Sequence, residues 1–321
     1  MVRHSHTAAL VRSDDETTAV AASFLEEGLR HGDLPVVAAS PRTAALVRDA
    51  LGERAGAVEE DARICLLGVR TPDAMVVTRR LLDRARATGS GRLRVLGEVQ
   101  FGTTARSRRE GERYESAANA LLATAPLTAL CLYDRRWLPD EVVAGARRTH
   151  PELVMGGVRV SSSEFRQPAE FLRELALRRD PVEAGEPVYA VDGAPALAGL
   201  RGELRRVFGE VVPDEDQRAD LHLGVSEVAA NAFRHGRRPI SARVWADRDT
   251  LVVTITDSGT GFADPLAGFV PAHGDDLAAG GMGLWLARKL WDSVDLVPGP
   301  AGLTVRLAAG LADPVSRRGA A

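Results

Sequence analysis

The sequence predicts two domains, an α/β domain followed by an α+β domain, and three observations lead to this prediction. Apolar strands alternate with helices over residues 1–165, as in a domain built on a parallel sheet. Residues 166–186 hold a short amphipathic helix and a stretch rich in chain breakers, so we expect a linker there. Residues 187–310 place most strands in hairpins, which is typical of an antiparallel sheet. At roughly 100–200 residues per domain, a chain of 321 residues has room for both.

The strands expected in the first half are short and almost continuously apolar. Such strands are typical of a parallel sheet that helices cover on both faces. The expected strands span residues 8–11, 34–39, 63–67, 93–98 and 128–133. The expected helices span residues 14–31, 41–51, 72–87, 114–123 and 140–149. The alternation therefore predicts a three-layer domain with a mostly parallel sheet.

The second half begins with a strand and two helices and continues with paired strands. Its expected helices span residues 195–211, 213–234 and 284–292, and Gly236 ends the second of them. Its expected strands span residues 188–191, 242–246, 251–256, 294–297 and 303–307. We therefore expect an antiparallel sheet with helices on one face.

Charge and composition exclude several classes of protein. The chain has 41 Lys and Arg residues against 44 Asp and Glu residues, for a net charge of −3. This balance argues against a chain-wide basic surface for nucleic acid, although a local patch stays open. No helix-turn-helix pattern is present in the sequence, so we expect no direct DNA binding. No apolar run reaches about 18 residues, and the N-terminus lacks a signal-peptide core. A cytoplasmic protein without a membrane segment is expected.

The two cysteines, Cys65 and Cys131, are too few for a disulfide scaffold or a zinc site built on cysteines. Both lie in apolar runs, where a buried and unreactive thiol is the usual case.

A first motif with chemical potential lies on the long helix of the second half. Glu227, Asn231 and His235 recur every four residues, so they share one stripe of that helix. A carboxylate can accept a proton, and a carboxamide oxygen can bind a hard cation. A solvated helix face is the common alternative for such a pair. For His235, a role in helix capping and packing is favoured over chemistry.

Two glycine-rich motifs follow. Asp257 directly follows a strand, where its carboxylate can accept a hydrogen bond from an exocyclic amine. Gly259 and Gly261 let the backbone come close to a ligand. Further on, Gly281 and Gly283 open a helix, whose free backbone N–H groups suit a phosphate. Each motif is common alone, but the three in this order indicate a nucleotide site.

With these motifs, residues 187–308 resemble the GHKL (Bergerat-fold) ATPases. The segment 227–236 resembles their N box, 257–261 their first glycine box and 281–283 their second. The form Glu-x3-Asn-Ala-x2-His-Gly and the short separation of the glycine boxes are most similar to the anti-sigma-factor and serine-protein kinase branch.

This resemblance implies that ATP binds together with Mg²⁺. Glu227 would be the base that accepts the proton of an attacking serine hydroxyl, and Asn231 would coordinate Mg²⁺. Asp257 would bind the adenine amine, while the glycines shape the pocket and cradle the phosphates. The nucleotide-binding positions implied are Asn231, Asp257, Gly259, Gly261, Gly281, Gly283 and Thr304. For Arg288 and Lys289, a solvated helix face is favoured over phosphate contacts.

The first half resembles the MEDS sensory domain, a RecA-like regulatory module. The residues that carry this resemblance are the segments 24–33, 94–98, 131–134 and 149–151. The half lacks a Gly-x4-Gly-Lys-Ser/Thr phosphate loop, so no ATPase activity is assigned to it. Glu98 ends a strand where related ATPases keep an acidic residue. For His6 and His150, a place in the core or on the surface is favoured over a ligand pocket.

Together the two resemblances imply a signalling switch that regulates transcription. The chain would sequester a sigma factor and phosphorylate a serine or threonine of a STAS-type anti-anti-sigma protein. The first domain would sense a small molecule or a partner and act on the ATP lid, residues 262–280. A non-catalytic ATP-binding module is the alternative, and a homodimer stays open. A histidine kinase is disfavoured, because residues 168–179 contain no phosphoacceptor histidine.

Overall fold

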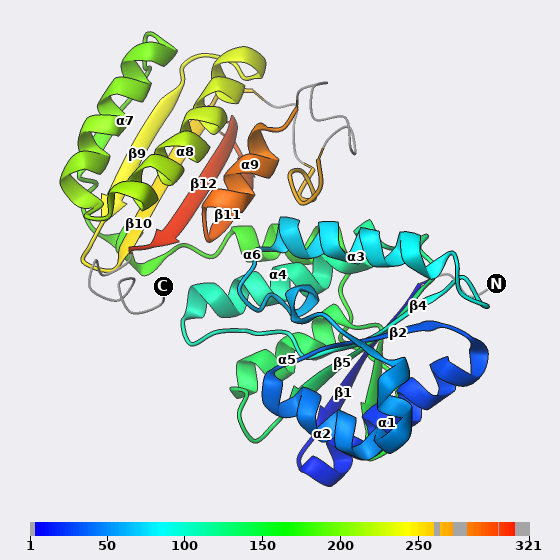
Figure 1. Cartoon of the computed structure of the whole chain (residues 1–321). Coiled ribbons are helices and arrows are strands. Elements are labelled where there is room, and N and C mark those ends of the chain that lie inside the picture. Colours follow the sequence, from blue (N-terminus) through cyan, green and yellow to red (C-terminus); the bar gives the residue numbers. More distant parts are fainter. Residues whose placement is uncertain (1–3, 260–263, 272–280, 301, 312–321) are drawn as a thin grey trace. The chain divides into compact units, whose positions relative to one another are not determined.

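The computed structural model describes residues 4–259, 264–271, 281–300 and 302–311 (Figure 1). The chain divides into two compact units, Met1–Phe171 and Leu172–Ala321. The division falls inside helix α6 (Pro168–Ala176). Each unit has its own sheet and core, so each is described by itself.

The first unit is built on a seven-stranded sheet in the order β3-β2-β4-β5-β1-β6-β7. All neighbouring strands are parallel except β6 and β7, which form an antiparallel hairpin. The strands are β1 (Ser5–Val11), β2 (Leu34–Ala38), β3 (Glu59–Glu60), β4 (Leu93–Gly97), β5 (Leu127–Asp134), β6 (Glu152–Met155) and β7 (Val158–Ser161). The expectation of a mostly parallel α/β sheet is confirmed.

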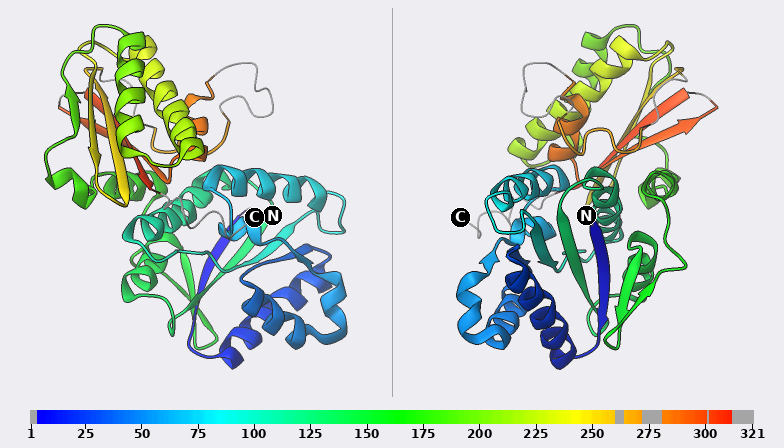
Figure 2. Two further views of the ribbon diagram at one scale, coloured as in Figure 1. Left: turned by 60° about the vertical axis from the view of Figure 1, so that its left-hand side comes forward. Right: turned by 90° about the vertical axis from the view of Figure 1, so that its right-hand side faces the viewer.

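Helices cover both faces of this sheet, as Figure 2 shows. They are α1 (Asp14–His31), α2 (Pro41–Leu51), α3 (Thr71–Ala85), α4 (Ala105–Leu121) and α5 (Asp140–Thr149). Apolar side chains of α1 and α2 share one core with β1, β2, β4 and β5. The Ser13 side chain accepts the Glu16 N–H at the start of α1, and Gly32 ends that helix at φ 73°.

The prediction of a strand at residues 63–67 is wrong. The segment Ala62–Cys65 forms the short 3-10 helix η2, which follows the 3-10 helix η1 (Gly52–Ala57). The Asp61 side chain accepts the Arg63 N–H and so starts a turn rather than a strand. Ile64 and Cys65 are nevertheless buried. A short apolar run does not reveal whether its residues are extended or helical.

Helix α4 begins nine residues earlier than the expected start at residue 114. Thr104 and Ser107 cap its N-terminus reciprocally, with each side chain accepting the other residue's backbone N–H. The β6–β7 hairpin was not expected either. Its turn consists of Gly156 and Gly157, both with positive φ.

The second unit has a five-stranded sheet in the order β11-β12-β10-β9-β8, antiparallel throughout. Its strands are β8 (Tyr189–Val191), β9 (Ser241–Ala246), β10 (Thr250–Asp257), β11 (Ser293–Gly299) and β12 (Gly302–Gly310). Its helices are α7 (Leu197–Val211), α8 (Glu215–His235) and α9 (Gly283–Leu290). The predicted α+β architecture is confirmed.

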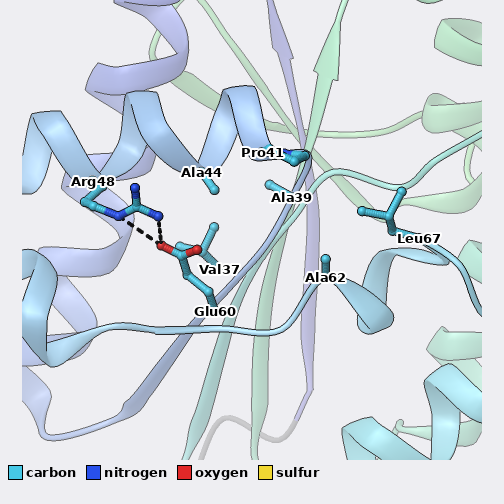
Figure 3. A pocket seen from close by; sticks show the side chains of 8 residues that line it. All are labelled: Val37, Ala39, Pro41, Ala44, Arg48, Glu60, Ala62 and Leu67. Carbon is cyan, nitrogen blue, oxygen red and sulfur yellow. Dashed lines mark hydrogen bonds and ion pairs between the residues drawn. The ribbon is translucent and has the colours of Figure 1, made fainter.

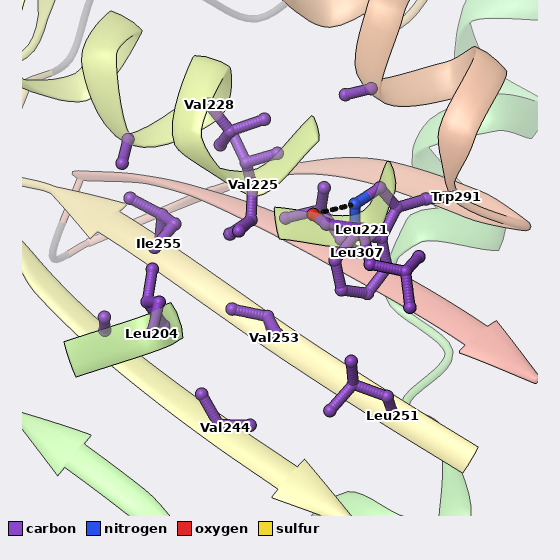
Figure 4. Packing of buried hydrophobic residues seen from close by; sticks show 14 of the residues in the cluster. Leu204, Leu221, Val225, Val228, Val244, Leu251, Val253, Ile255, Trp291 and Leu307 are labelled. Carbon is purple, nitrogen blue, oxygen red and sulfur yellow. Dashed lines mark hydrogen bonds between the residues drawn. The ribbon is translucent and has the colours of Figure 1, made fainter. Parts of the chain in front are cut away.

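One core joins these three helices to one face of the sheet, as Figure 4 shows. Leu204 of α7 and Val225 of α8 pack against Val253 of β10 in this core. Trp291, which follows α9, is 1% exposed and donates its indole N–H to the Leu221 carbonyl at 3.1 Å. The carbonyl satisfies the only polar group of the indole, so this large side chain can be buried without an unpaired donor.

Part of the expected linker packs onto the sheet of the second unit. Arg306 of β12 donates to the Ala176 carbonyl at 2.9 Å, and its Nε lies 3.0 Å from the Glu183 carboxylate. Glu183 belongs to the 3-10 helix η3 (Pro181–Ala184). Within the part of the chain that the structure describes, no helix has the length and apolar character to span a membrane.

Candidate functional site

The first and third motifs of the second unit meet where α9 begins beside α8. A Cβ atom on Gly283 would lie 2.8 Å from Asn231 Nδ2 and 3.4 Å from Glu227 Cβ. Gly224 allows a second close approach, because a Cβ there would lie 2.8 Å from the Trp291 ring. Gly283 therefore lets the N-terminus of α9 lie directly against the Glu227–Asn231 stripe, and Gly224 makes room for Trp291 at the other end of α9.

The second motif joins them through Asp257, at the end of β10. This side chain is 7% exposed, and its Oδ1 accepts the Gly259 N–H at 2.7 Å and the Arg237 N–H at 3.3 Å. A Cβ on Gly236, at the end of α8, would lie 2.5 Å from Asp257 Cγ. Among the described residues no donor reaches Oδ2. One carboxylate oxygen is thus fixed by the backbone, and the other remains open to a ligand amine.

Thr304 lies next to Asp257 across the sheet. It pairs with Thr256 in the β10–β12 register, and the two hydroxyl oxygens are 2.9 Å apart. Gly302 has φ 122°, and a Cβ on it would collide with the Asp257 carbonyl oxygen. Thr304 therefore lies one strand away from the predicted adenine position.

Glu227 is half-buried and has a cationic neighbour that the sequence did not reveal. Arg201 of α7 lies with Nη2 3.9 Å from Glu227 Oε1 and donates to the Ser226 carbonyl at 3.1 Å. About a third of each side chain is exposed, so this ion pair is worth about 1 kcal/mol or less. The carboxylate thus stays accessible to an incoming hydroxyl group.

The ATP-lid segment is described only over residues 264–271, and Gly261 lies outside the described residues. Phe269 in this part is fully buried. Arg288 of α9 donates to the Ala267 carbonyl at 2.9 Å and to the Val294 carbonyl at 2.8 Å, and its guanidinium lies 4.0 Å from the Phe269 ring centre. Arg288 is buried, so the expectation of a solvated helix face was wrong. Gly281 is exposed with φ 72° at the start of α9.

The residues around Asn231 fit a Mg²⁺ ion that shares its coordination with phosphate. Asn231 is half-buried and offers one carboxamide oxygen, a hard ligand of the kind Mg²⁺ prefers. The adjacent N-terminus of α9 supplies backbone N–H groups for an anion. Mg²⁺ commonly takes one or two protein ligands and completes its octahedron with phosphate and water.

In the first unit, the residues that carry the sensory-domain resemblance form a buried polar network. Arg94 of β4 lies 2.7 Å from Asp33 and donates to the Phe24 carbonyl at 3.1 Å and to Glu27 at 3.0 Å. A Cβ on Gly28 would collide with the Arg94 side chain. These residues therefore fasten α1 to the sheet.

Glu98 also has a structural role. Its carboxylate accepts hydrogen bonds from the backbone N–H of Ser40 at 2.9 Å and from the Ser40 hydroxyl at 2.7 Å. A cavity of about 420 Å³ lies close by, at the start of α2 (Figure 3). Its lining residues are Val37, Ala39, Pro41, Ala44, Arg48, Glu60, Ala62 and Leu67. Arg48 and Glu60 form an ion pair at its edge.

Known protein families match both units. Residues 5–151 match the MEDS family, described as MEthanogen/methylotroph, DcmR Sensory domain. Residues 193–309 match the histidine kinase-like ATPase domain. These two matches agree with the two resemblances seen in the sequence.

Individual proteins match the second unit. The serine-protein kinase RsbW of Bacillus velezensis is 33% identical over 133 residues, which are 38% of this chain and 78% of that protein. RsbW of Bacillus subtilis matches with the same identity and coverage. The crystal structure of the RsbU and RsbW domains of Rv1364c from Mycobacterium tuberculosis is 22% identical, with a TM-score of 0.29, over 40% of this chain and 34% of that one.

Proposed function

The chain belongs to the family of the RsbW serine-protein kinases through its histidine kinase-like ATPase domain, and on this premise we propose that it is an ATP-dependent regulator of transcription in the cytoplasm. One observation carries the proposal. The start of α9 lies against Asn231 of α8, while Gly236 of the same helix packs on Asp257. Three motifs separated in sequence thus adjoin one another as a single nucleotide site requires.

In the proposed reaction, the second domain transfers the γ-phosphoryl group of ATP to a serine or threonine hydroxyl. Asp257 accepts a hydrogen bond from the adenine amine, and the N-terminus of α9 binds the phosphates. Asn231 would hold Mg²⁺, which when bound neutralises phosphate charge. The bond between the γ-phosphorus and the bridging oxygen breaks, and that oxygen leaves with ADP. A bond forms between the γ-phosphorus and the hydroxyl oxygen, and Glu227 takes the hydroxyl proton.

The proposed protein partners are a sigma factor, which the ATP-bound domain sequesters, and a STAS-type anti-anti-sigma protein, which it phosphorylates. The first domain would control this switch by binding a small molecule. Its cavity of about 420 Å³ is large enough for such a ligand. We further propose that two copies can form a homodimer and that the chain does not bind DNA directly.

A non-catalytic ATP-binding module is the alternative, and one contact of Glu227 is compatible with it. Arg201 lies 3.9 Å from the Glu227 carboxylate, so Glu227 can serve to join α7 and α8 instead of accepting a proton.

The two functions differ in phosphoryl transfer. The full-length protein is incubated with γ-labelled ATP and Mg²⁺ together with each STAS-type protein of its own cell, and sigma-factor binding is measured in parallel. Transfer of label to a serine or threonine of one STAS-type protein supports the kinase. Tight ATP and sigma-factor binding without any transfer supports the binding module.

A further inference from the structure

Four side chains that can bind metals converge inside the first unit. They come from four elements: His6 from β1, Glu115 from α4, Cys131 from β5 and His150 from the end of α5. One ligand atom of each lies within 4.8 Å of all the others, and all four side chains are buried. The proposed ATP site is in the other unit, so this cluster has no part in it.

The hydrogen bonds fix which ring nitrogen of His6 faces the cluster. The Asn119 amide donates to the carbonyls of Glu115 and Thr149, at 3.1 and 2.8 Å, so its Oδ1 can only accept. This oxygen lies 3.1 Å from His6 Nδ1, which must therefore carry a hydrogen. When the His6 ring is neutral, the lone pair of Nε2 therefore faces Glu115 Oε2, 3.0 Å away.

His150 is oriented in the same way. Its Nδ1 lies 3.0 Å from the Ala146 carbonyl, which can only accept a hydrogen bond. The Nε2 atom therefore carries the lone pair. It is buried, has no hydrogen-bond partner among the described residues, and lies 3.6 Å from Glu115 Oε2.

Three acceptor atoms thus meet with too few protons to satisfy them. The two imidazole Nε2 atoms and Glu115 Oε2 face one another, and only the Cys131 thiol brings a proton to them. Its sulfur lies 3.3 Å from His6 Nε2 and 3.7 Å from Glu115 Oε2. A single S–H group can satisfy one of these acceptors, whereas a cation at the centre would satisfy all of them.

The spacing suits a tetrahedral ion. Zinc bonds of about 2.0–2.1 Å to nitrogen or oxygen and about 2.3 Å to sulfur place tetrahedral ligand atoms about 3.2–3.8 Å apart. The four separations given above run from 3.0 to 3.7 Å. The other two separations, His6–His150 and His150–Cys131, are within 4.8 Å. These ligand atoms would therefore draw together by up to about 1 Å around the ion.

A second layer of groups supports these ligands. Tyr133 donates its hydroxyl to the other carboxylate oxygen, Glu115 Oε1, at 3.3 Å. Both histidines hold their Nδ1 hydrogen against an oxygen acceptor, which is the usual arrangement of metal-bound histidine. The set of two nitrogens, one sulfur and one carboxylate oxygen matches the preferences of Zn²⁺ and not those of Mg²⁺ or Ca²⁺.

We propose that His6, Glu115, Cys131 and His150 bind one Zn²⁺ ion in the interior of the first domain. Cys131 releases its thiol proton to the solvent when the ion binds. Four protein ligands complete the tetrahedron, so the ion ties β1, α4, β5 and the end of α5 together rather than acting on a substrate. The small number of cysteines excludes a zinc site made mainly of thiolates, but not this mixed one.

The full-length protein, freed of metal with a chelator, provides the test. It is titrated with Co²⁺ in the absence of nucleotide, followed by optical absorption, and then with Zn²⁺. We expect one equivalent of Co²⁺, a thiolate-to-metal charge-transfer band, and loss of that band when Zn²⁺ displaces Co²⁺. Only a cysteine ligand produces this band, so the proposed Mg²⁺ position at Asn231 cannot imitate it.

Two matched variants assign the band. Cys131→Ser is expected to abolish the band and to weaken Zn²⁺ binding at least about tenfold. Cys65→Ser removes the other buried thiol, which donates to the Ala62 carbonyl at 2.9 Å and lies outside the cluster, so the band should remain. Absence of the band in folded wild-type protein would overturn the proposal. Equal loss of the charge-transfer band in Cys131→Ser and Cys65→Ser would also overturn the proposal. If Cys131→Ser fails to fold, the wild-type spectrum together with Cys65→Ser still decides.

Discussion

Asp257 in the second unit and Glu115 in the first are both buried carboxylates, but their surroundings differ. Asp257 receives backbone N–H groups from Gly259 and Arg237 on one oxygen, while the other oxygen has no donor among the described residues. Glu115 is enclosed by side chains from three other elements, including His6 and Cys131. A carboxylate with one open oxygen suits a ligand that exchanges, such as a nucleotide. A fully enclosed carboxylate suits a resident ion.

The groups around each carboxylate show the same difference. In the proposed nucleotide site, Asn231 and Glu227 are half-buried and Gly281 is exposed, so a ligand can reach them. Near Glu115, His150 is fully buried. The second unit thus leaves the polar groups of its proposed site within reach of a ligand, whereas the first unit encloses its cluster.

The largest effect is expected from Glu227→Gln. Loss of a general base should reduce phosphoryl transfer by about 10²–10⁴-fold, while ATP affinity changes little because Glu227 holds no part of the nucleotide. The measurement is the initial rate of labelled phosphate transfer to a STAS-type protein, with ATP affinity determined in parallel. Transfer at the wild-type rate would remove Glu227 from the mechanism.

A smaller effect is expected from Gly283→Ala. The added methyl group would meet Asn231 Nδ2 at 2.8 Å, so the Asn231 side chain or α9 must shift, at a cost of about 1–3 kcal/mol in unfolding free energy. Gly202→Ala is the control. Gly202 lies on the exposed face of α7, and nothing lies within 4 Å of the new Cβ. There we expect a gain of up to about 1 kcal/mol. Denaturant titration compares both variants; equal changes would contradict the close approach of α9 to α8.

The smallest effect is expected from Arg201→Gln. The substitution removes a partly exposed ion pair and the hydrogen bond to the Ser226 carbonyl, so unfolding free energy should fall by about 0.5–2 kcal/mol. If Glu227 acts as a base, the transfer rate should also stay within a few-fold of wild type. A loss of transfer as large as that of Glu227→Gln would instead show that the pair acts as a unit.

The motifs of the proposed nucleotide site could be recognised in the sequence because their signals are local. Asp257 and Gly259 are two residues apart, and Glu227 and Asn231 are one helical turn apart. The side-chain packing could not be predicted. Arg288 has the character of a surface residue, and only the tertiary structure shows that it is buried against the Phe269 ring.

The cluster around Glu115 could not be predicted for the same reason. Its members are separated by up to 144 positions, between His6 and His150, and the parallel sheet brings them together. The strand order depends on non-local pairing, which no short motif encodes. The alternation of strands and helices nevertheless predicted the architecture of the first unit, and the hairpin-linked strands predicted that of the second. It was wrong at residues 63–67, where Asp61 starts a turn.

The most direct test of the central claim, a single Mg-ATP site formed by three motifs, is calorimetric titration of ATP into the full chain and into Asp257→Asn. This substitution replaces the open carboxylate oxygen with an amide and removes a charge-assisted acceptor for the adenine amine. We predict that ATP affinity falls by about 1.5–3 kcal/mol, or about 10- to 150-fold, while the fold is retained. An affinity equal to that of wild type in a folded variant would contradict the adenine position and, with it, the nucleotide site proposed here.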